Sequence, residues 1–330
     1  MDELMKVVNL KKYFPVNVGF FRSIASKQEI SVKAVDNISF NIKKKEIFGL
    51  AGESGSGKTT TGRLVLRLTE PTGGKAYFEG KNIFETAEKD TKALRKRMQM
   101  IFQDPYESLN PRFTVYDIIS EPLKIHKVLR NEKEIEEKVL EKLEEVKITP
   151  PEQFLLRYPH ELSGGQRQRV ALARSLVLDP EFIVADEPVS MLDVSIRAEV
   201  LNLMFDLIQK HNVSFLYITH DLALSRHICD RISIMYLGKI MEMSDAEKIV
   251  YEPLHPYTRA LIAAVPVPDP SAKRSEAVIK GEIPSPINPP SGCRFHTRCP
   301  SYIGDICRTK EPEFTDVGGE HYVACHLYDI

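Results

Sequence analysis

The chain has 330 residues, enough for about two domains. Hydrophobic residues make up 42% and charged residues 28%, a balance that excludes a wholly disordered chain. With 45 Lys and Arg against 46 Asp and Glu, there is no basic excess, so we expect no nucleic-acid partner. No apolar run approaches the roughly 18 residues that span a bilayer, and the first residues do not resemble a secretory signal. We therefore expect a cytoplasmic chain unless a partner brings it to a membrane.

Apolar, β-rich runs alternate with helical patterns along much of the chain. The helical stretch 131–147 spaces Ile135, Val139, Leu143 and Val146 three and four residues apart, and its remaining Glu and Lys are most simply a solvated face. Strands interleaved with helices favour an α/β fold whose core sheet is mainly parallel. The predicted strand runs are 47–52, 97–103, 182–187, 214–220 and 231–240.

Composition changes near residue 265. The segment 265–292 carries seven prolines and little periodicity, which predicts a linker that can neither continue a helix nor lie inside a sheet. Near the start of the chain, residues 15–32 read as an inserted hairpin or long loop.

Four cysteines, Cys293, Cys299, Cys307 and Cys325, fall within the last 40 residues, whereas Cys229 stands apart. A cytosolic setting disfavours disulfides between them. Structural zinc usually shows C-x2-C pairs, which are absent here, and an iron–sulfur cluster takes four thiolates at varied spacings. From the residues alone, zinc and iron–sulfur stay level.

The stretch from Gly52 to Thr59 fits the phosphate-loop pattern G-x-x-x-x-G-K-[ST] between a strand run and a helical stretch. Its backbone N–H groups and the helix N-terminus face a phosphate in such loops. Lys58 would reach the β- and γ-phosphates, and Thr59 would ligate Mg²⁺. The competing interpretation is a Gly/Ser-rich turn with a chance lysine. The candidate nucleotide-binding residues here are Gly52, Ser54, Gly55, Ser56, Gly57, Lys58, Thr59 and Thr60.

The ends of two further predicted strands carry candidate catalytic or Mg²⁺-binding side chains. The apolar run 182–185 leads into Asp186, which would hold Mg²⁺, and Glu187, which would polarise an attacking water. Taken alone, this pair reads as an acidic loop. His220 ends another strand run, where its imidazole could hydrogen-bond a γ-phosphate, although a lone histidine there is more often structural.

Residues 162–166 read Leu-Ser-Gly-Gly-Gln before a helical stretch. Such a helix N-terminus is a second anion site. Because one nucleotide rarely needs two such sites, we expect this one to serve a nucleotide held by another subunit.

The LSGGQ sequence together with the phosphate loop resembles the ATP-binding cassette (ABC) ATPases over about residues 5–265. The resemblance implies a mainly parallel core sheet, an antiparallel N-terminal β region and a helical signature subdomain at about 105–178. It implies that Gln103 contacts Mg²⁺, that Glu187 is catalytic and that His220 is the switch histidine. It also implies that the partner's ATP is capped by Ser163, Gly164, Gly165 and Gln166, with Asp193 in the D-loop; Met191 replaces the usual alanine of that loop.

The same resemblance implies an aromatic side chain stacked on adenine near the N-terminus. The sequence NLKKYFPV offers Tyr13 and Phe14. Matching the family's K-x-Y-P pattern puts Phe14 in the stacking position, which needs only a π-face, with Tyr13 as the close alternative.

The tail resembles that of the dipeptide and oligopeptide importer ATPases, in HPYTRALIAAVP (255–266) and NPPSGCRFHTRCP (288–300), and within them the F-type subunits (DppF or OppF). That resemblance implies a [4Fe-4S] cluster on Cys293, Cys299, Cys307 and Cys325. His296 and His326 could substitute as ligands but are more simply neighbouring residues. The implied domains are a cassette at 1–265 and a linker with a Cys-rich domain at 266–330.

The implied function is ATP hydrolysis, with Mg²⁺, that powers di- or oligopeptide uptake. The implied partners are a second ATP-binding subunit, two transmembrane permeases and an extracytoplasmic peptide-binding protein. The chain would be peripheral, on the cytoplasmic face of the membrane. The alternative is a non-transport ABC ATPase of the DNA-repair or translation type, and a third class is a redox sensor. The transported solute and the choice between homo- and heterodimer lie beyond the sequence.

Overall fold

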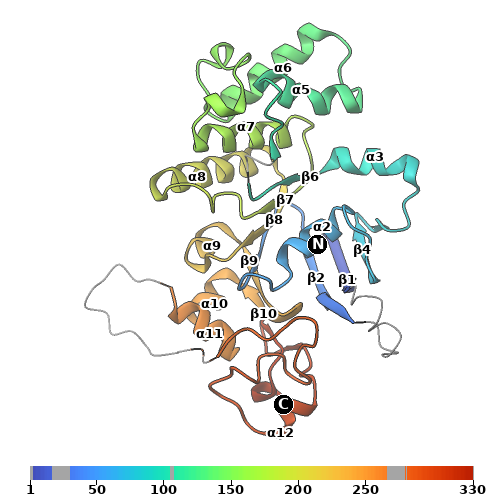
Figure 1. Cartoon of the computed structure of the whole chain (residues 1–330), viewed down its shortest axis with the longest axis vertical. Helices are drawn as coiled ribbons and strands as arrows, with labels where there is room; N and C mark the ends of the chain where they lie inside the picture. Colours follow the sequence, from blue (N-terminus) through green and yellow to red (C-terminus); the bar gives the residue numbers. More distant parts are fainter. Residues whose placement is uncertain (1–2, 17–29, 105–107, 266–278, 280, 330) are drawn as a thin grey trace. The chain divides into compact units, whose positions relative to one another are not determined.

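The structure is a computed structural model that describes residues 3–16, 30–104, 108–265, 279 and 281–329 (Figure 1). The chain forms two compact units. Of the described residues, unit 1 holds 43–46, 85–104 and 108–217, and unit 2 holds the rest. Most of the predicted insertion at 15–32 and the first part of the predicted linker lie outside the described residues. Among the described helices, none is both long and apolar enough to cross a bilayer.

Unit 1 is built on a parallel strand pair and a group of helices. Strands β6 (Met98–Ile101) and β7 (Phe182–Asp186) pair in parallel, with Met98 opposite Phe182, and every residue of β7 is buried. Helices α5 (Val115–His126) and α6 (Glu132–Glu145) pack on each other and on α7 (Gly164–Leu176), which also contacts α8 (Val194–His211). The short turns η1 (Pro151–Gln153) and η2 (Pro159–Glu161) join α6 to α7. The predicted helical signature region is therefore confirmed.

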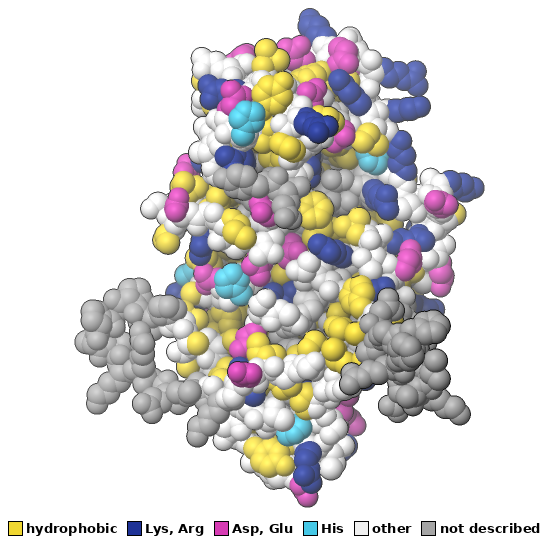
Figure 2. Space-filling model, viewed as in Figure 1, with side chains coloured by type: hydrophobic (Ala, Val, Ile, Leu, Met, Phe, Trp, Pro, Cys, Tyr) yellow, Lys and Arg dark blue, Asp and Glu magenta, His cyan; other side chains and the backbone are white. Residues whose placement is uncertain are grey.

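The outer edge of unit 1 is basic. Helix α3 (Glu88–Arg97) has no buried residue, and half of its ten residues are Lys or Arg. Figure 2 shows Lys and Arg side chains along the edge where α3 and α5 lie. Arg97 pairs with Glu181, and we assign this basic edge no ligand.

Helix α6 has the apolar stripe that the sequence predicted, since all four stripe residues are buried. The prediction that the Glu and Lys residues of this helix form a solvated face is wrong for Lys142, because its side chain is only 1% exposed. Its ammonium group lies 2.9 Å from Glu145 and 3.2 Å from Asp179. Burial lowers the pKa of Lys142, but these carboxylates outweigh burial and raise it. A buried charge is tolerated when it is paired in this way.

Unit 2 begins with an antiparallel sheet of four strands in the order β2-β1-β4-β5. These strands are β1 (Glu3–Pro15), β2 (Ser31–Lys43), β4 (Gly73–Phe78) and β5 (Lys81–Asn82). Strand β4 pairs antiparallel with both β1 and β5. The predicted antiparallel N-terminal β region is confirmed.

A second group of strands in unit 2 carries the phosphate loop. Strand β3 (Ile47–Ala51) is fully buried and pairs in parallel with β9 (Arg231–Tyr236), which pairs antiparallel with β10 (Lys239–Asp245). The run 231–240 was predicted as one strand, but it is a hairpin. Leu237 and Gly238 have φ of 42° and 80°, the left-handed conformations that a tight two-residue turn requires.

Helices and the cysteine-rich segment complete unit 2. Helix α2 (Lys58–Val65) follows β3. Helices α10 (Ala246–Tyr251) and α11 (Pro256–Ala263) pack on β10, and α9 (Leu222–Ile228) packs on β3 and on these two helices. Strand β8 (Ser214–Thr219) crosses the boundary between the units along the chain. The cysteine-rich segment contains α12 (Asp305–Thr309), β11 (Thr315–Asp316), β12 (Tyr322–Val323) and η3 (His326–Tyr328).

The cysteine-rich segment is tied to unit 2 through strand pairing. Glu242 of β10 lies opposite Val323 of β12, and β12 pairs with β11. The segment therefore extends the sheet that holds β3 and β9. The domain boundary at residues 265 and 266 remains a prediction.

We predict that Lys142→Met lowers the free energy of unfolding by about 2 kcal/mol, because Glu145 then loses a buried partner. Burial raises the pKa of Glu145, but hydrogen bonds from Lys210 and Lys142 lower it to about 2. The stabilisation is therefore present above pH 4.5, the usual pKa of a glutamate, and is lost as the pH falls towards 2. Chemical denaturation at pH 7 and at pH 3 measures both effects.

The matched control is Lys133→Met, in the first turn of the same helix, where the side chain is exposed. This variant should unfold within about 0.5 kcal/mol of the parent chain. Equal losses in the two variants would contradict a specific role for the buried ion pair.

Candidate functional site

The phosphate loop between β3 and α2 is confined by backbone carbonyls. Gly52 has a φ of 148°, and a Cβ there would lie 2.1 Å from the carbonyl oxygen of Met235. Gly57 has a φ of 107°, and a Cβ there would lie 2.1 Å from the carbonyl oxygen of Ala34. Both positions require glycine, so the sequence pattern reflects the close approach of two other strands.

The side chains of this loop suit an anion at the start of α2. Lys58 is buried, and its ammonium group donates to the carbonyls of Gly52 at 2.7 Å and Glu53 at 3.0 Å. Ser56 is also buried, and its hydroxyl has no hydrogen-bond partner among the described residues. Thr59 and Thr60 open α2 at the surface of unit 2, half-buried. A buried cation, an unpaired hydroxyl and a helix N-terminus together fit a phosphate group.

Glu53, the second residue of the loop, is held by two residues to which the sequence analysis gave no role. Its backbone N–H donates to the hydroxyl of Tyr257 at 3.0 Å. Arg298 donates to its two carboxylate oxygens at 2.8 and 3.3 Å. Both partners lie in motifs of the tail, HPYTRAL and RFHTRC, where the resemblance was the only available signal.

In unit 1, the structure brings together two of the predicted site residues, Gln103 and Glu187. Asp186 ends β7 and is buried, and Glu187 follows in the left-handed conformation with a φ of 45°. The side-chain amide of Gln103 donates to the Glu187 carboxylate at 3.2 Å. Left-handed residues other than glycine are uncommon and concentrate at functional sites.

The LSGGQ sequence opens α7 with a capping box. Ser163 Oγ accepts from the N–H of Gln166 at 3.3 Å, and Gln166 Oε1 accepts from the N–H of Ser163 at 2.9 Å. The side chain of Gln166 is therefore engaged locally, whereas Ser163 is exposed. A Cβ at Gly165 would lie 2.7 Å from the Ile196 side chain of α8, so this glycine allows the two helices to meet closely.

The remaining predicted nucleotide residues are at exposed chain turns. Asp193 precedes α8 and makes no side-chain capping hydrogen bond. It is flanked by exposed apolar side chains, with Met191 61% and Val194 81% exposed. In unit 2, His220 is exposed at the end of β8, next to Asp221, which caps α9.

Tyr13 and Phe14 lie near the end of β1 and differ in their contacts. The hydroxyl of Tyr13 donates to Asp36, and burial followed by this hydrogen bond raises its pKa to about 12. Phe14 is 40% exposed, with the Lys12 ammonium group 5.0 Å from its ring centre.

The four tail cysteines are close enough to influence one another electrostatically. Burial raises the pKa of Cys293 to about 12, and the other three thiols add to that rise. Burial likewise raises the pKa of Cys325 to about 11, with contributions from Cys299 and Cys307. The backbone N–H of Cys293 also donates to the carbonyl of Cys307 at 2.8 Å.

The two histidines near these cysteines, and the separate Cys229, make contacts of their own. Both ring nitrogens of His326 are hydrogen-bonded, to Asp329 and to the Lys310 carbonyl, and His296 Nδ1 bonds to the Cys293 carbonyl at 2.8 Å. Cys229 is buried against Gly49 of β3. Within the described part of the chain, no group of three or more His, Cys, Asp or Glu side chains is placed to hold a metal ion.

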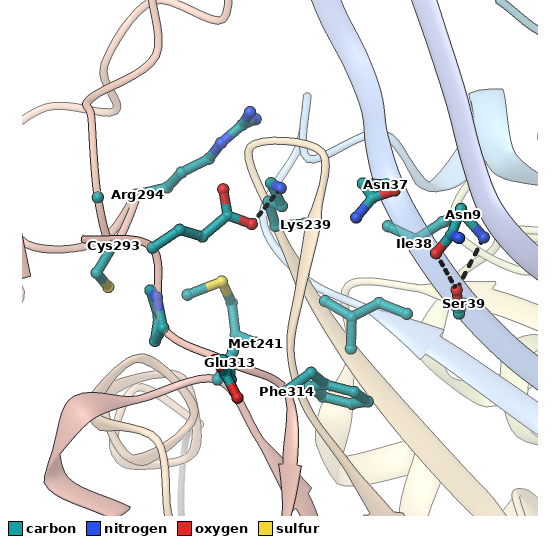
Figure 3. Close-up of a pocket in the computed structure, with 15 residues that line it drawn as sticks. Asn9, Asn37, Ile38, Ser39, Lys239, Met241, Cys293, Arg294, Glu313 and Phe314 are labelled. Carbon is teal, nitrogen blue, oxygen red and sulfur yellow. Dashed lines mark hydrogen bonds and ion pairs between the residues drawn. The ribbon is translucent and has the colours of Figure 1, made fainter. Parts of the chain in front are cut away.

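Cys293 and Arg294 line one side of a pocket of about 380 Å³, drawn in Figure 3. Asn37 and Ser39 of β2 lie across from them. Lys239 forms an ion pair with Glu311 inside the pocket. Its lining is therefore shared by the N-terminal sheet and the cysteine-rich segment, both in unit 2.

Comparison with known proteins matches two family profiles. The profile described as ABC transporter covers residues 35–190, and the profile described as the C-terminal region of oligopeptide/dipeptide transporters covers 241–307. The oligopeptide transport ATP-binding protein AppF of Bacillus subtilis (strain 168) is 50% identical over 330 residues, 99% of this chain and 98% of AppF. The putative oligopeptide transport ATP-binding protein YkfD of the same strain is 48% identical over 98% of this chain and 95% of its own length.

Solved structures agree on the cassette. The dimeric post-hydrolysis state of the ATP-binding cassette MJ0796, bound to ADP and Pi, matches with a TM-score of 0.64 and 26% identity over 73% of this chain and 98% of that one. CbiO1 from Clostridium perfringens, part of the ABC transporter complex cbiONQ, matches with a TM-score of 0.64 and 25% identity over 76% of this chain and 92% of its own.

We predict that Gly165→Ala leaves the chain about 1–2 kcal/mol less stable than Gly164→Ala, because the added methyl group at 165 overlaps Ile196. Gly164 is the matched control, since a Cβ there would meet only Leu192, at 3.4 Å. Thermal unfolding measures the difference. Adding Ile196→Ala should make the two alanine variants equal, and a difference that persists would contradict the packing explanation.

Proposed function

The chain belongs to the ABC transporter ATP-binding proteins of the oligopeptide and dipeptide importer group, and on that basis we propose that it hydrolyses ATP to power peptide uptake. The relatives that match nearly its whole length carry transport names. The alternative of a DNA-repair or translation ATPase is therefore not supported.

The observation that carries the catalytic proposal is the pair of Glu187 and Gln103. A buried strand delivers Asp186 and then Glu187, and the left-handed backbone at Glu187 places its carboxylate beside the Gln103 amide. A carboxylate fixed by a hydrogen bond can accept a proton from an attacking water. We therefore assign Glu187 as the general base and His220 as the residue that hydrogen-bonds the γ-phosphate.

Of the residues proposed to bind the triphosphate, one set would contact the phosphates and another would ligate Mg²⁺. Lys58 and the loop backbone, from Gly52 through Thr60, would bind the β- and γ-phosphates. The hydroxyl of Thr59, the amide oxygen of Gln103 and the carboxylate of Asp186 are all oxygen donors, the ligands that suit Mg²⁺. When bound, Mg²⁺ neutralises charge on the phosphate oxygens.

We place Phe14 against the adenine ring, with Tyr13 as the alternative. The ring of Phe14 is 40% exposed, whereas the Tyr13 hydroxyl is anchored on Asp36. Stacking needs an accessible π-face, which favours Phe14.

A second cassette would complete each ATP site. The exposed Ser163 and the N–H groups of Gly164 and Gly165 at the start of α7 can bind an anion brought by another subunit. The exposed Asp193, with Met191 and Val194 beside it, fits the same subunit contact. The dimeric MJ0796 cassette is a precedent for such pairing. The second cassette is a paralogous subunit or a second copy of this chain.

The membrane partners follow from peptide import. We propose two transmembrane permease subunits and an extracytoplasmic peptide-binding protein, with this chain peripheral on the cytoplasmic face of the membrane. The names of AppF and YkfD, both oligopeptide transport ATP-binding proteins, support this arrangement.

We predict that Glu187→Gln lowers ATP turnover at least about 100-fold while ATP binding is retained, because it removes the base but leaves the phosphate loop intact. Lys58→Ala should instead weaken ATP binding. Phosphate release, equilibrium ATP binding and uptake of labelled peptide by cells that carry the complete transporter are the measurements. Wild-type turnover in the Glu187 variant would refute the assignment, and peptide uptake that is unaffected by either variant would refute the transport function.

For the tail, we propose that Cys293, Cys299, Cys307 and Cys325 bind one [4Fe-4S] cluster. The four thiols lie close enough to affect one another's pKa, and three of them, Cys293, Cys299 and Cys307, lie within the region that matches the oligopeptide/dipeptide transporter profile. Four thiolates complete the iron coordination of such a cluster. The engaged nitrogens of His326 argue against its use as a substitute ligand.

We predict that anaerobically purified protein carries about four iron and four sulfide per chain and absorbs visible light. Cys299→Ser should lower the iron content sharply, whereas Cys229→Ser, the control, should leave it unchanged. Stoichiometric zinc without iron, in protein kept free of oxygen throughout, would overturn the cluster.

A further inference from the structure

The segment 293–299 runs between two of the tail cysteines and contacts the phosphate loop. Arg298, next to Cys299, is bonded to Glu53 through two nitrogens, at 2.8 and 3.3 Å. The pair lies largely out of water, since the side chains are 8% and 24% exposed. A two-point, charge-assisted contact of this kind fixes the direction as well as the distance of the carboxylate.

Aromatic packing holds this contact in place. Phe295 is fully buried, and its ring centre lies 5.4 Å from that of Tyr236 and 5.2 Å from that of Tyr257. The hydroxyl of Tyr257 also accepts the hydrogen bond from the backbone N–H of Glu53. The side chain and the backbone of Glu53 are therefore both held by the part of the chain beyond residue 255.

A second arginine anchors the other end of the segment. Arg294, next to Cys293, pairs with Asp36 and donates to the carbonyl of Leu237. Asp36 also accepts from the hydroxyl of Tyr13, one of the two candidate adenine contacts. Each of the two cysteines is thus adjacent to an arginine that contacts the nucleotide-binding part of unit 2.

The position of Glu53 gives these contacts a consequence for binding. Its carbonyl accepts from Lys58 at 3.0 Å, so its backbone belongs to the phosphate loop itself. An unpaired carboxylate there would repel a triphosphate, and a loop free to move would lose the aligned N–H groups. Arg298 counters both effects, because it neutralises the carboxylate and restrains the loop.

We propose that Arg298 is a positioning residue for ATP, which couples the phosphate loop to the cysteine-rich segment through Glu53. The proposal rests on ATP as the ligand of the loop but does not depend on which metal the cysteines hold. By linkage, ATP binding must then stabilise the segment 293–299 to the same extent that the segment favours ATP binding.

The test is a double-mutant cycle on the full chain, with a non-hydrolysable ATP analogue as the probe. Arg298→Gln should weaken binding of the analogue about 10-fold, within the range usual for coupled sites. Glu53→Gln should weaken it by a similar factor, because it breaks the same two-point contact, and the double variant should lose little more than either single variant, since both changes act through one contact. Arg298→Lys should fall between, since it keeps the charge but loses the two-point contact.

The control is Arg308→Gln, which lies in the cysteine-rich segment but outside 293–299. Its ion pair with Asp305 is exposed on both sides, so the affinity of this variant should equal that of the wild type. Hydrogen exchange supplies a readout that a merely structural role would not move. The analogue should slow exchange in peptides covering 293–299 in the wild type but not in Arg298→Gln.

Unchanged affinity in Arg298→Gln, or losses from the two single variants that add up in the double variant, would overturn the proposal while the ATPase function stands. A wild-type chain that fails to bind the analogue would overturn the ATPase function, and this proposal with it.

Discussion

The fold of unit 2 depends on a phosphate loop whose glycines leave room for two strands that pack directly against the loop backbone. The carbonyl of Met235, from β9, lies against Gly52, and the carbonyl of Ala34, from β2, lies against Gly57. One of these strands belongs to the parallel group around β3 and the other to the antiparallel sheet. The loop is therefore the point at which both sheets of unit 2 meet, and its glycines serve packing as much as phosphate binding.

The cysteine-rich segment packs on this same nucleotide-binding unit. Its strand β12 pairs with β10, its Phe295 completes an aromatic cluster, and its arginines pair with Glu53 and Asp36. Arginine suits these positions because its planar guanidinium binds a carboxylate at two points and tolerates partial burial. A segment too short to support its own core gains one by packing on the nucleotide-binding unit.

In unit 1, the end of a strand and the start of a helix position the candidate site residues. Its buried strand β7 ends in two carboxylates, and the left-handed backbone at Glu187 turns the second one towards Gln103. Helix α7 starts with a self-contained capping box, so its first N–H groups are held in place without help from a distant element. Rigid strand and helix ends thus position residues that have to meet a charged ligand.

Local patterns in the sequence determined the elements and the motifs. The apolar runs predicted β3, β7 and β8, the spacing in 131–147 predicted α6, and the glycines around Lys58 predicted the phosphate loop. These features depend on residues a few positions apart, which is why composition and spacing suffice. The pairing of Gln103 with Glu187 was not derivable from spacing and came only as two separate roles in a resemblance.

Tertiary structure alone decided which charges are buried and which residues meet across the chain. Lys142 looked solvated by periodicity, yet it pairs with Asp179 from beyond its helix. The run 231–240 looked like one strand, yet left-handed residues at its centre fold it into a hairpin. Arg298 and Glu53 are 245 residues apart, and no local pattern marks either as the partner of the other. The free energy of such a contact depends on desolvation and on the surrounding packing, and both exist only once the chain has folded.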